Sequence, residues 1–294
     1  MKYNGIMTAL VTPIDDRGIV DAESLQNLIQ FQLKNNVSSL LVLGGTGEYS
    51  ALSNAERQRA IDITVQEVNG KVPVVAGIIA PGIGDAIEFG LYAKCAGVDA
   101  IMPVTPYYVS PTQEGIMKYY QDLDTALDMP MFLYNIPYKT AVNLQPETVE
   151  YLVEKIPNII GIKECSPNLG QFIDLTRRVG EKIYVLSGEE FLAMSEMVLG
   201  AHGAVMASAN LVPDVWVKMW EHLQKGSVQE AVKLNTAYYP LFRAIFKEGN
   251  PGPLKTAMNM TGLLVGNVST PLLHPSTETV NELTKVMKQL QLCN

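Results

Sequence analysis

A regular alternation of short β-branched runs and longer helical segments limits the folds open to this chain more than any other feature. The apolar runs recur about every 30 residues, the length of one βα unit. They cover residues 7–11, 40–43, 72–76, 100–104, 131–134, 159–162, 183–186 and 204–206. Parallel strands joined by crossover helices produce this pattern. Eight such units without a Ser/Gly-rich linker favour a closed (β/α)8 barrel, the TIM barrel of the α/β class, over an open sheet.

The C-terminal part of the chain has a helical pattern instead. Apolar periodicity continues through residues 228–247 and 277–290. A group of helix breakers separates these two segments, namely Gly249, Pro251, Gly252 and Pro253. These helices exceed what a barrel requires. We therefore expect residues 1–225 to form the barrel and residues 226–294 to form a C-terminal helical region packed on it.

Polar residues mark two helix starts within the barrel. Ser53 with Glu56 has the spacing of a capping box. Ser110, Pro111 and Gln113 supply an N-cap, a proline at the first helical position and a polar partner at the third. We expect a helix to begin at each place.

Composition excludes several classes of function. The 294 residues are 47% hydrophobic, enough to bury a substantial core. The formal charge of -8 lacks the basic excess that nucleic acids or anionic membranes attract, so we expect neither as a partner. No apolar stretch approaches the roughly 20 residues that span a bilayer, and the N-terminal segment is unlike a secretory signal. A cytoplasmic location is the expectation.

Cysteine and histidine are sparse and scattered. The three cysteines, Cys95, Cys165 and Cys293, form an odd, widely spaced set without a CxxC pair, which is typical of a reducing compartment. The three histidines show neither HxH nor HExxH spacing, so we expect no metal and no cofactor. An amine nucleophile is then the remaining route to carbonyl activation.

Two side chains that end strands are candidates for that chemistry, because catalytic groups of such barrels lie at the C-terminal strand ends. Lys163 ends one strand. At an apolar barrel mouth its ammonium form loses hydration, which frees the amine to attack a ketone and form a Schiff base. The alternative is a solvated lysine that only terminates the strand. Tyr134 ends the preceding strand, where its phenol could relay protons or simply pack at the rim.

The segment LGGTGEYSAL, residues 43–52, follows the second strand. Its glycines let backbone N–H groups converge on an anion, and Thr46 adds a hydroxyl. It has neither the Walker pattern nor the GxGxxG spacing of a dinucleotide site, so a carboxylate is the expected ligand and a tight turn the alternative. After the fourth strand, Tyr107 and Tyr108 could face inward or cover a subunit contact.

Four motifs, GGTGE, TPYY, YNIP and GIKE, occur in this order. With them the chain resembles the family of pyruvate-type class I aldolases that includes dihydrodipicolinate synthase and N-acetylneuraminate lyase, from Gly5 to about Leu290. The resemblance implies a (β/α)8 barrel with C-terminal helices, assembled as a homotetramer or homodimer. It also implies a lysine that forms an imine with pyruvate or another 2-oxo acid, with no cofactor besides that covalent imine.

Matching positions imply a role for individual residues. Lys163 would be the Schiff-base residue, and Tyr134 would be the proton relay. Gly45 and Thr46 would hold the carboxylate of the 2-oxo acid. Gly188 and Val205 would lie beside the bound keto acid. Glu190 matches an acid that meets sugar hydroxyls in the sialic acid branch, although Phe191 follows it instead of a second acid. Tyr108 matches a tyrosine that dihydrodipicolinate synthases lend across a dimer contact.

Departures from the family pattern bear on the second substrate. Dihydrodipicolinate synthases usually have two threonines where this chain has Gly45 and Thr46. They also have an arginine for the carboxylate of the aldehyde substrate where this chain has Lys139, which could still lie over that carboxylate. The loss of one relay hydroxyl and of the planar guanidinium weakens the lysine-biosynthesis interpretation.

The leading hypothesis is a lyase that forms or cleaves a carbon–carbon bond of pyruvate or of a 2-keto-3-deoxy sugar acid through a Lys163 imine. One alternative is 4-hydroxy-tetrahydrodipicolinate synthase, which joins pyruvate and aspartate semialdehyde. A second is a 2-oxo acid binding protein without turnover. At positions resembling the lysine feedback site, Asn54, Arg57 and Pro81 replace the usual polar and histidine residues, so we expect no inhibition by lysine.

Overall fold

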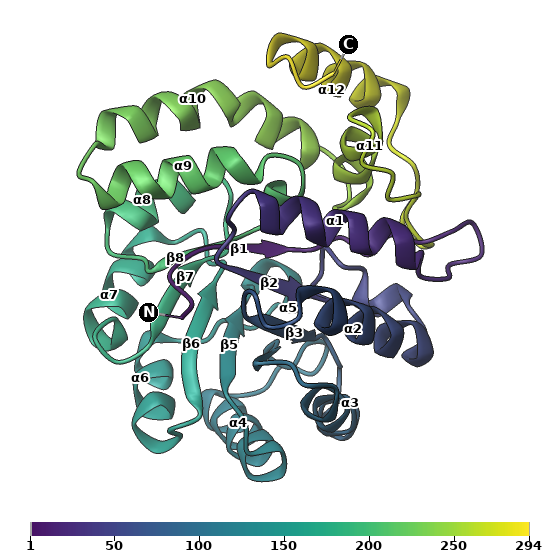
Figure 1. The fold of residues 1–294 in the computed structure, drawn as a ribbon. Coiled ribbons are helices and arrows are strands. Elements are labelled where there is room, and N and C mark those ends of the chain that lie inside the picture. Colours follow the sequence, from purple (N-terminus) through teal and green to yellow (C-terminus); the bar gives the residue numbers. More distant parts are fainter. Residues whose placement is uncertain (1, 294) are drawn as a thin grey trace.

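Eight parallel strands close into a barrel in the computed structural model, which describes residues 2–293 (Figure 1). The strands are β1 Gly5–Ala9, β2 Ser39–Val42, β3 Val74–Ile78, β4 Ala100–Pro103, β5 Met131–Asn135, β6 Ile159–Glu164, β7 Tyr184–Ser187 and β8 Gly203–Met206. Each strand pairs with the next, and β8 returns to β1, where Val205 pairs with Met7. The prediction of a TIM barrel is confirmed.

Helices follow the strands and surround the barrel. They are α1 Ala22–Lys34, α2 Asn54–Val68, α3 Ile83–Ala96, α4 Gln113–Leu127, α5 Pro137–Thr140, α6 Pro146–Lys155, α7 Leu169–Val179, α8 Ala193–Val198 and α9 Pro213–Gln224. Short 3-10 turns at Tyr49–Ala51 and Ser208–Asn210 follow β2 and β8. No helix within residues 2–293 is both long enough and apolar enough to cross a bilayer.

The alternation of side chains along the strands divides the core into two layers. Inside the barrel, Met7 and Phe132 belong to one buried cluster. Outside it, Ile162 packs in the larger cluster between strands and helices. Because successive strand residues point to opposite faces, Lys163 points into the barrel near the C-terminal end of β6. The fold thus delivers this side chain to the barrel mouth.

One of the two expected helix starts is correct and the other is displaced. Ser53 caps α2, and its hydroxyl accepts a hydrogen bond from the N–H of Glu56 at 3.3 Å. The prediction for α4 is wrong, because Thr112 and not Ser110 is its N-cap. The Thr112 hydroxyl accepts from the N–H of Gly115 at 3.2 Å. Both residues offer a capping hydroxyl, so the sequence alone does not separate them.

The C-terminal helices α10 Val228–Ile245, α11 Gly252–Met260 and α12 Thr277–Gln289 lie together at one side of the barrel (Figure 1). α10 and α12 correspond to the two expected segments. α11 does not, since it begins inside the group of residues that we expected only to break helices. Proline is tolerated in the first turn of a helix, where no backbone N–H has a partner within the helix, and Pro253 occupies such a position.

Candidate active site

Lys163 and Tyr134 lie side by side at the mouth of the barrel. They are partners in the register between β6 and β5. The Nζ atom of Lys163 lies 3.4 Å from the hydroxyl oxygen of Tyr134 and 4.5 Å from the centre of its ring. Only 7% of Lys163 and 5% of Tyr134 is exposed. Lys163 is therefore not the solvated residue that the alternative interpretation required.

Burial controls the protonation of the groups around this amine. It raises the pKa of Tyr134 well above its usual range, so the phenol keeps its proton at neutral pH. It also raises the pKa of the Cys165 thiol, which donates a hydrogen bond to the carbonyl oxygen of Gly188 at 3.3 Å. Tyr134 is thus a protonated phenol whose hydroxyl lies within reach of any atom bonded to Nζ of Lys163.

Residues 44–48, which we call the carboxylate loop, follow β2 and can receive an anion. The N–H of Gly47 donates to the carbonyl oxygen of Gly44 at 3.0 Å, and that of Glu48 donates to Gly45 at 3.1 Å. In the described part of the chain, the N–H groups of Gly45 and Thr46 have no acceptor of their own. The loop is a tight turn that leaves these two donors for a ligand.

Gly188 lies against the lysine, directly after β7. A Cβ atom at this position would lie 2.8 Å from Cε of Lys163 and 2.3 Å from Sγ of Cys165, so a larger residue would force these side chains to move. Val205 on β8 is 1% exposed and belongs to the same inner cluster as Tyr134. Gly188 therefore packs against the lysine, and Val205 faces the interior of the barrel.

Glu190 is buried near the lysine, but its carboxylate is already engaged. Oε1 accepts hydrogen bonds from the N–H groups of Ala207 at 2.6 Å and Ser208 at 3.1 Å. Burial raises the pKa of Glu190 to about 7, against the opposing effects of these hydrogen bonds and of the charge on Lys163. Glu190 thus supports the backbone after β8 at the barrel mouth.

Within residues 2–293, no three His, Cys, Asp or Glu side chains converge as a metal site requires.

Lys139 and Tyr108 lie outside this buried group. Lys139 is on the short helix α5, which follows β5, and it is exposed. Tyr108 is 96% exposed and has a positive φ of 75°. In a single chain its ring therefore projects into solvent.

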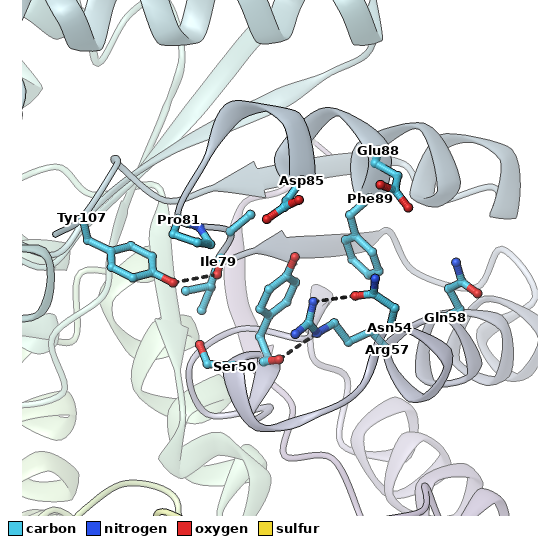
Figure 2. Close-up of a pocket in the computed structure, with 12 residues that line it drawn as sticks. Ser50, Asn54, Arg57, Gln58, Ile79, Pro81, Asp85, Glu88, Phe89 and Tyr107 are labelled. Atoms are coloured by element: carbon cyan, nitrogen blue, oxygen red, sulfur yellow. Dashed lines mark hydrogen bonds between the residues drawn. The ribbon is translucent and has the colours of Figure 1, made fainter. Parts of the chain in front are cut away.

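A separate cavity opens beside the segment that follows the carboxylate loop (Figure 2). It encloses about 420 Å³, and Asn54, Arg57 and Pro81 all line it. Arg57 donates from Nε to the carbonyl oxygen of Tyr49 at 2.8 Å and from Nη1 to Oδ1 of Asn54 at 2.9 Å. Its guanidinium also stacks over the Tyr49 ring, 4.1 Å from the centre. The hydroxyl of Tyr107 closes another side by donating to the carbonyl oxygen of Ile79 at 3.2 Å.

A polar network behind the lysine is not among the expected site residues. Asn135 and Glu164 directly follow Tyr134 and Lys163, are paired in register, and are buried. Nδ2 of Asn135 donates to the two oxygens of Glu164 at 2.9 and 3.1 Å, and the N–H of Ser166 donates to Oε1 at 2.6 Å. Burial raises the pKa of Glu164 to about 7. A polar residue at the same register position of two neighbouring apolar strands is the signal that points to such a network.

Comparison with known sequences gives matches along nearly the whole chain. Residues 2–290 match the sequence model of the Dihydrodipicolinate synthetase family. The 4-hydroxy-tetrahydrodipicolinate synthase of Methanocaldococcus jannaschii is 38% identical over 290 residues, which cover 99% of both chains. The protein of the same name from Bacillus subtilis is 37% identical over 278 residues, which are 95% of this chain and 96% of the relative.

Solved structures agree with these matches. The crystal structure of dihydrodipicolinate synthase from Aquifex aeolicus has a TM-score of 0.95 at 33% identity and 99% coverage of each chain. The chloride-inhibited dihydrodipicolinate synthase from Acinetobacter baumannii, crystallised with pyruvate, has the same TM-score, identity and coverage. The similarity therefore includes the C-terminal helices as well as the barrel.

Proposed function

The chain belongs to the dihydrodipicolinate synthetase family of class I aldolases, and we propose that it makes 4-hydroxy-tetrahydrodipicolinate from pyruvate and aspartate semialdehyde. Relatives with that name match nearly its full length. From the sequence alone, a sugar-acid lyase is the leading hypothesis, whereas the relatives support the synthase better. The observation that carries the proposal is the buried Lys163 amine, 3.4 Å from the Tyr134 hydroxyl.

The first half of the reaction uses these two groups. The Nζ atom of Lys163 attacks the ketone carbon of pyruvate, and the ketone oxygen becomes the hydroxyl of a carbinolamine. Tyr134 donates a proton to that hydroxyl, which leaves as water and yields a protonated imine. The Gly45 and Thr46 N–H groups and the Thr46 hydroxyl hold the pyruvate carboxylate, so that the ketone faces the amine.

The second half forms the carbon–carbon bond. The imine withdraws electrons, so the Tyr134 phenolate left by the first half removes a proton from the methyl carbon and an enamine results. The enamine carbon attacks the aldehyde carbon of the second substrate, and the aldehyde oxygen takes that proton from Tyr134. Lys139 pairs with the carboxylate of that substrate as a single ammonium group. The amino group of the second substrate then attacks the imine carbon and closes a ring, while the bond from that carbon to Nζ breaks. One proton of the attacking nitrogen goes to Nζ, which leaves as the free amine of Lys163, and the other returns to Tyr134.

Gly45 and Lys139 also allow a second candidate function, that of a sugar-acid lyase. Gly45 supplies no hydroxyl, and Lys139 lacks the planar fork that binds a carboxylate with two hydrogen bonds. Both features relax the requirement for a second substrate that carries a carboxylate. Hydroxylated aldehydes would then be accepted at the same imine.

Borohydride trapping followed by a turnover assay tests the proposal. Pyruvate with borohydride should add one reduced adduct to the intact chain, and peptide mapping should place it on Lys163. In a separate assay without borohydride, pyruvate and aspartate semialdehyde together should give product at a rate that Lys163→Ala abolishes. Cleavage of a 2-keto-3-deoxy sugar acid without synthase activity would support the lyase. Capture without any turnover would support a binding protein, and no capture at all would refute the imine.

A further inference from the structure

The carboxylate loop receives a hydrogen bond from the C-terminal part of the chain. Nδ2 of Asn250, which lies just before α11, donates to Oγ1 of Thr46 at 3.0 Å. Only 7% of Thr46 is exposed. The two residues are 204 positions apart, so the docking of the C-terminal helices brings this amide to the loop.

An ion pair joins the same two regions. Nζ of Lys255 on α11 lies 2.6 Å from Oε1 of Glu48, and each side chain is only 1% exposed. Lys255 also donates to the carbonyl oxygen of Asn267 at 2.9 Å, while Oε2 of Glu48 accepts from the N–H of Ser269 at 2.8 Å. Desolvation of two charges cancels much of their attraction, so a buried pair is a poor source of net stability. Its clearer effect is to fix the end of the carboxylate loop in one geometry.

The direction of the Asn250 hydrogen bond decides what the Thr46 hydroxyl can do. A hydroxyl has one hydrogen and two lone pairs. The amide hydrogen of Asn250 occupies one lone pair, so the hydrogen of the Thr46 hydroxyl must point to another acceptor. An incoming carboxylate is such an acceptor, next to the two N–H groups of the loop. Asn250 therefore prepares Thr46 as a donor.

We propose that Asn250 and the Glu48–Lys255 ion pair are positioning residues, which hold Thr46 as a hydrogen-bond donor to the carboxylate of the 2-oxo acid. This inference rests on the proposed function, because it assumes that a 2-oxo acid binds at the carboxylate loop. The C-terminal helices then complete the substrate site from outside the barrel. None of the three positioning residues touches the reacting atoms.

Replacement of Asn250 by aspartate gives the sharpest test, since Asn250→Asp keeps the shape and reverses the polarity. The new carboxylate accepts the Thr46 hydrogen, which turns the donor away from the substrate. We expect the pyruvate concentration for half-maximal borohydride capture to rise roughly 10- to 100-fold, the value of one hydrogen bond to a charged group. Capture of methyl pyruvate, which has no charged carboxylate, should change far less. Asn27→Asp, on the exposed face of α1, is the matched control and should resemble the wild type.

The double variant Glu48→Gln with Lys255→Met tests the ion pair without leaving either charge alone in the core. We expect its KM for pyruvate to rise while kcat changes little, with folding confirmed by circular dichroism. Unchanged pyruvate capture in Asn250→Asp would overturn the inference. So would an equal loss for pyruvate and methyl pyruvate, which a merely structural role predicts. Failure of the wild type itself to capture pyruvate would instead refute the proposed function, and the inference with it.

Discussion

The amine of Lys163 and the hydroxyl of Tyr134 face each other across adjacent strands at a distance of 3.4 Å. This separation is longer than a good hydrogen bond, so it leaves both groups free to bind a third atom. The oxygen of a carbinolamine on Lys163 would lie within reach of the phenol. Because both residues are on strands, their spacing is fixed before substrate arrives.

Tyr134→Phe should separate proton transfer from imine formation. Phenylalanine keeps the ring that packs inside the barrel, whereas the proton donor is lost. We expect kcat to fall by about 10²- to 10⁴-fold, with little change in stability, because that is the usual contribution of a positioned acid or base. Borohydride should still capture pyruvate, although more slowly. A variant that turns over at the wild-type rate would show that another group supplies the proton.

Gly188→Ala should damage the site through a single methyl group. The new Cβ would lie within 2.8 Å of Cε of Lys163, so the lysine must move. We expect kcat/KM to fall by about 100-fold, the effect of a displacement near 1 Å. Gly84→Ala is the matched control, because its Cβ would meet no atom within 4 Å. Equal activities for the two variants would contradict the close packing.

Lys139 should govern the second substrate and not the first. Lys139→Ala removes the charge proposed to meet the carboxylate of aspartate semialdehyde. We expect its KM for that substrate to rise about 10-fold, the lower end for a charged hydrogen bond, while pyruvate capture stays unchanged. Lys139→Arg restores a charge in a forked geometry and should lower KM below the wild-type value. An unchanged KM in Lys139→Ala would remove this residue from the site.

Lysine should not inhibit the enzyme. The cavity of Figure 2 contains the three residues that resemble positions of the lysine feedback site, and Arg57 is fixed there by two hydrogen bonds and by the Tyr49 ring. The expectation rests on the replacement of the family's usual polar and histidine residues at these three positions, because the carboxylates of Asp85 and Glu88 line the same cavity and offset the charge of Arg57. Steady-state rates should stay constant as lysine is added at saturating pyruvate. A saturable decrease in rate would disprove the expectation.

The barrel could be predicted from sequence because its signals are local. A run such as 159–162 shows strand character by itself, and the polar residue that ends it must lie at the mouth once the barrel is assumed. Position and chemistry make Lys163 a candidate, and the resemblance to the aldolase family is what favours it over a solvated lysine. The cap of α4 at Thr112 did not follow, since Ser110 offers the same hydroxyl two residues earlier.

Contacts between distant segments left no such local signal. The bond from Asn250 to Thr46 depends on how the C-terminal helices dock, which no period in the sequence specifies. The Glu48–Lys255 ion pair also could not be predicted from the sequence, because a glutamate or a lysine in a helix or loop is usually exposed. Burial of both charges becomes visible only in three dimensions.

Glu196 on α8 should make the protein less stable as pH rises through neutrality. It is fully buried. Burial, with the negative charges of Glu164 and Glu189, raises the pKa of Glu196 to about 8, against the lowering effect of the Ser187 hydroxyl beside it. An unfolded glutamate has a pKa of about 4.3. Between these values the folded state holds a proton that the unfolded state has released.

The contribution of Glu196 to the free energy of unfolding should therefore be largest below about pH 4.3. It should fall by up to roughly 1.4 kcal/mol per pH unit as the pH rises to about 8. Glu196→Gln removes the titration, so its advantage over the wild type should grow from pH 5 to pH 8. Urea unfolding at each pH measures this difference. Glu221→Gln, on the exposed surface of α9, is the matched control and should follow the wild-type curve. Parallel curves for Glu196→Gln and the wild type would mean that the buried carboxyl is already ionised near pH 5, and hence reached by water or by a cation.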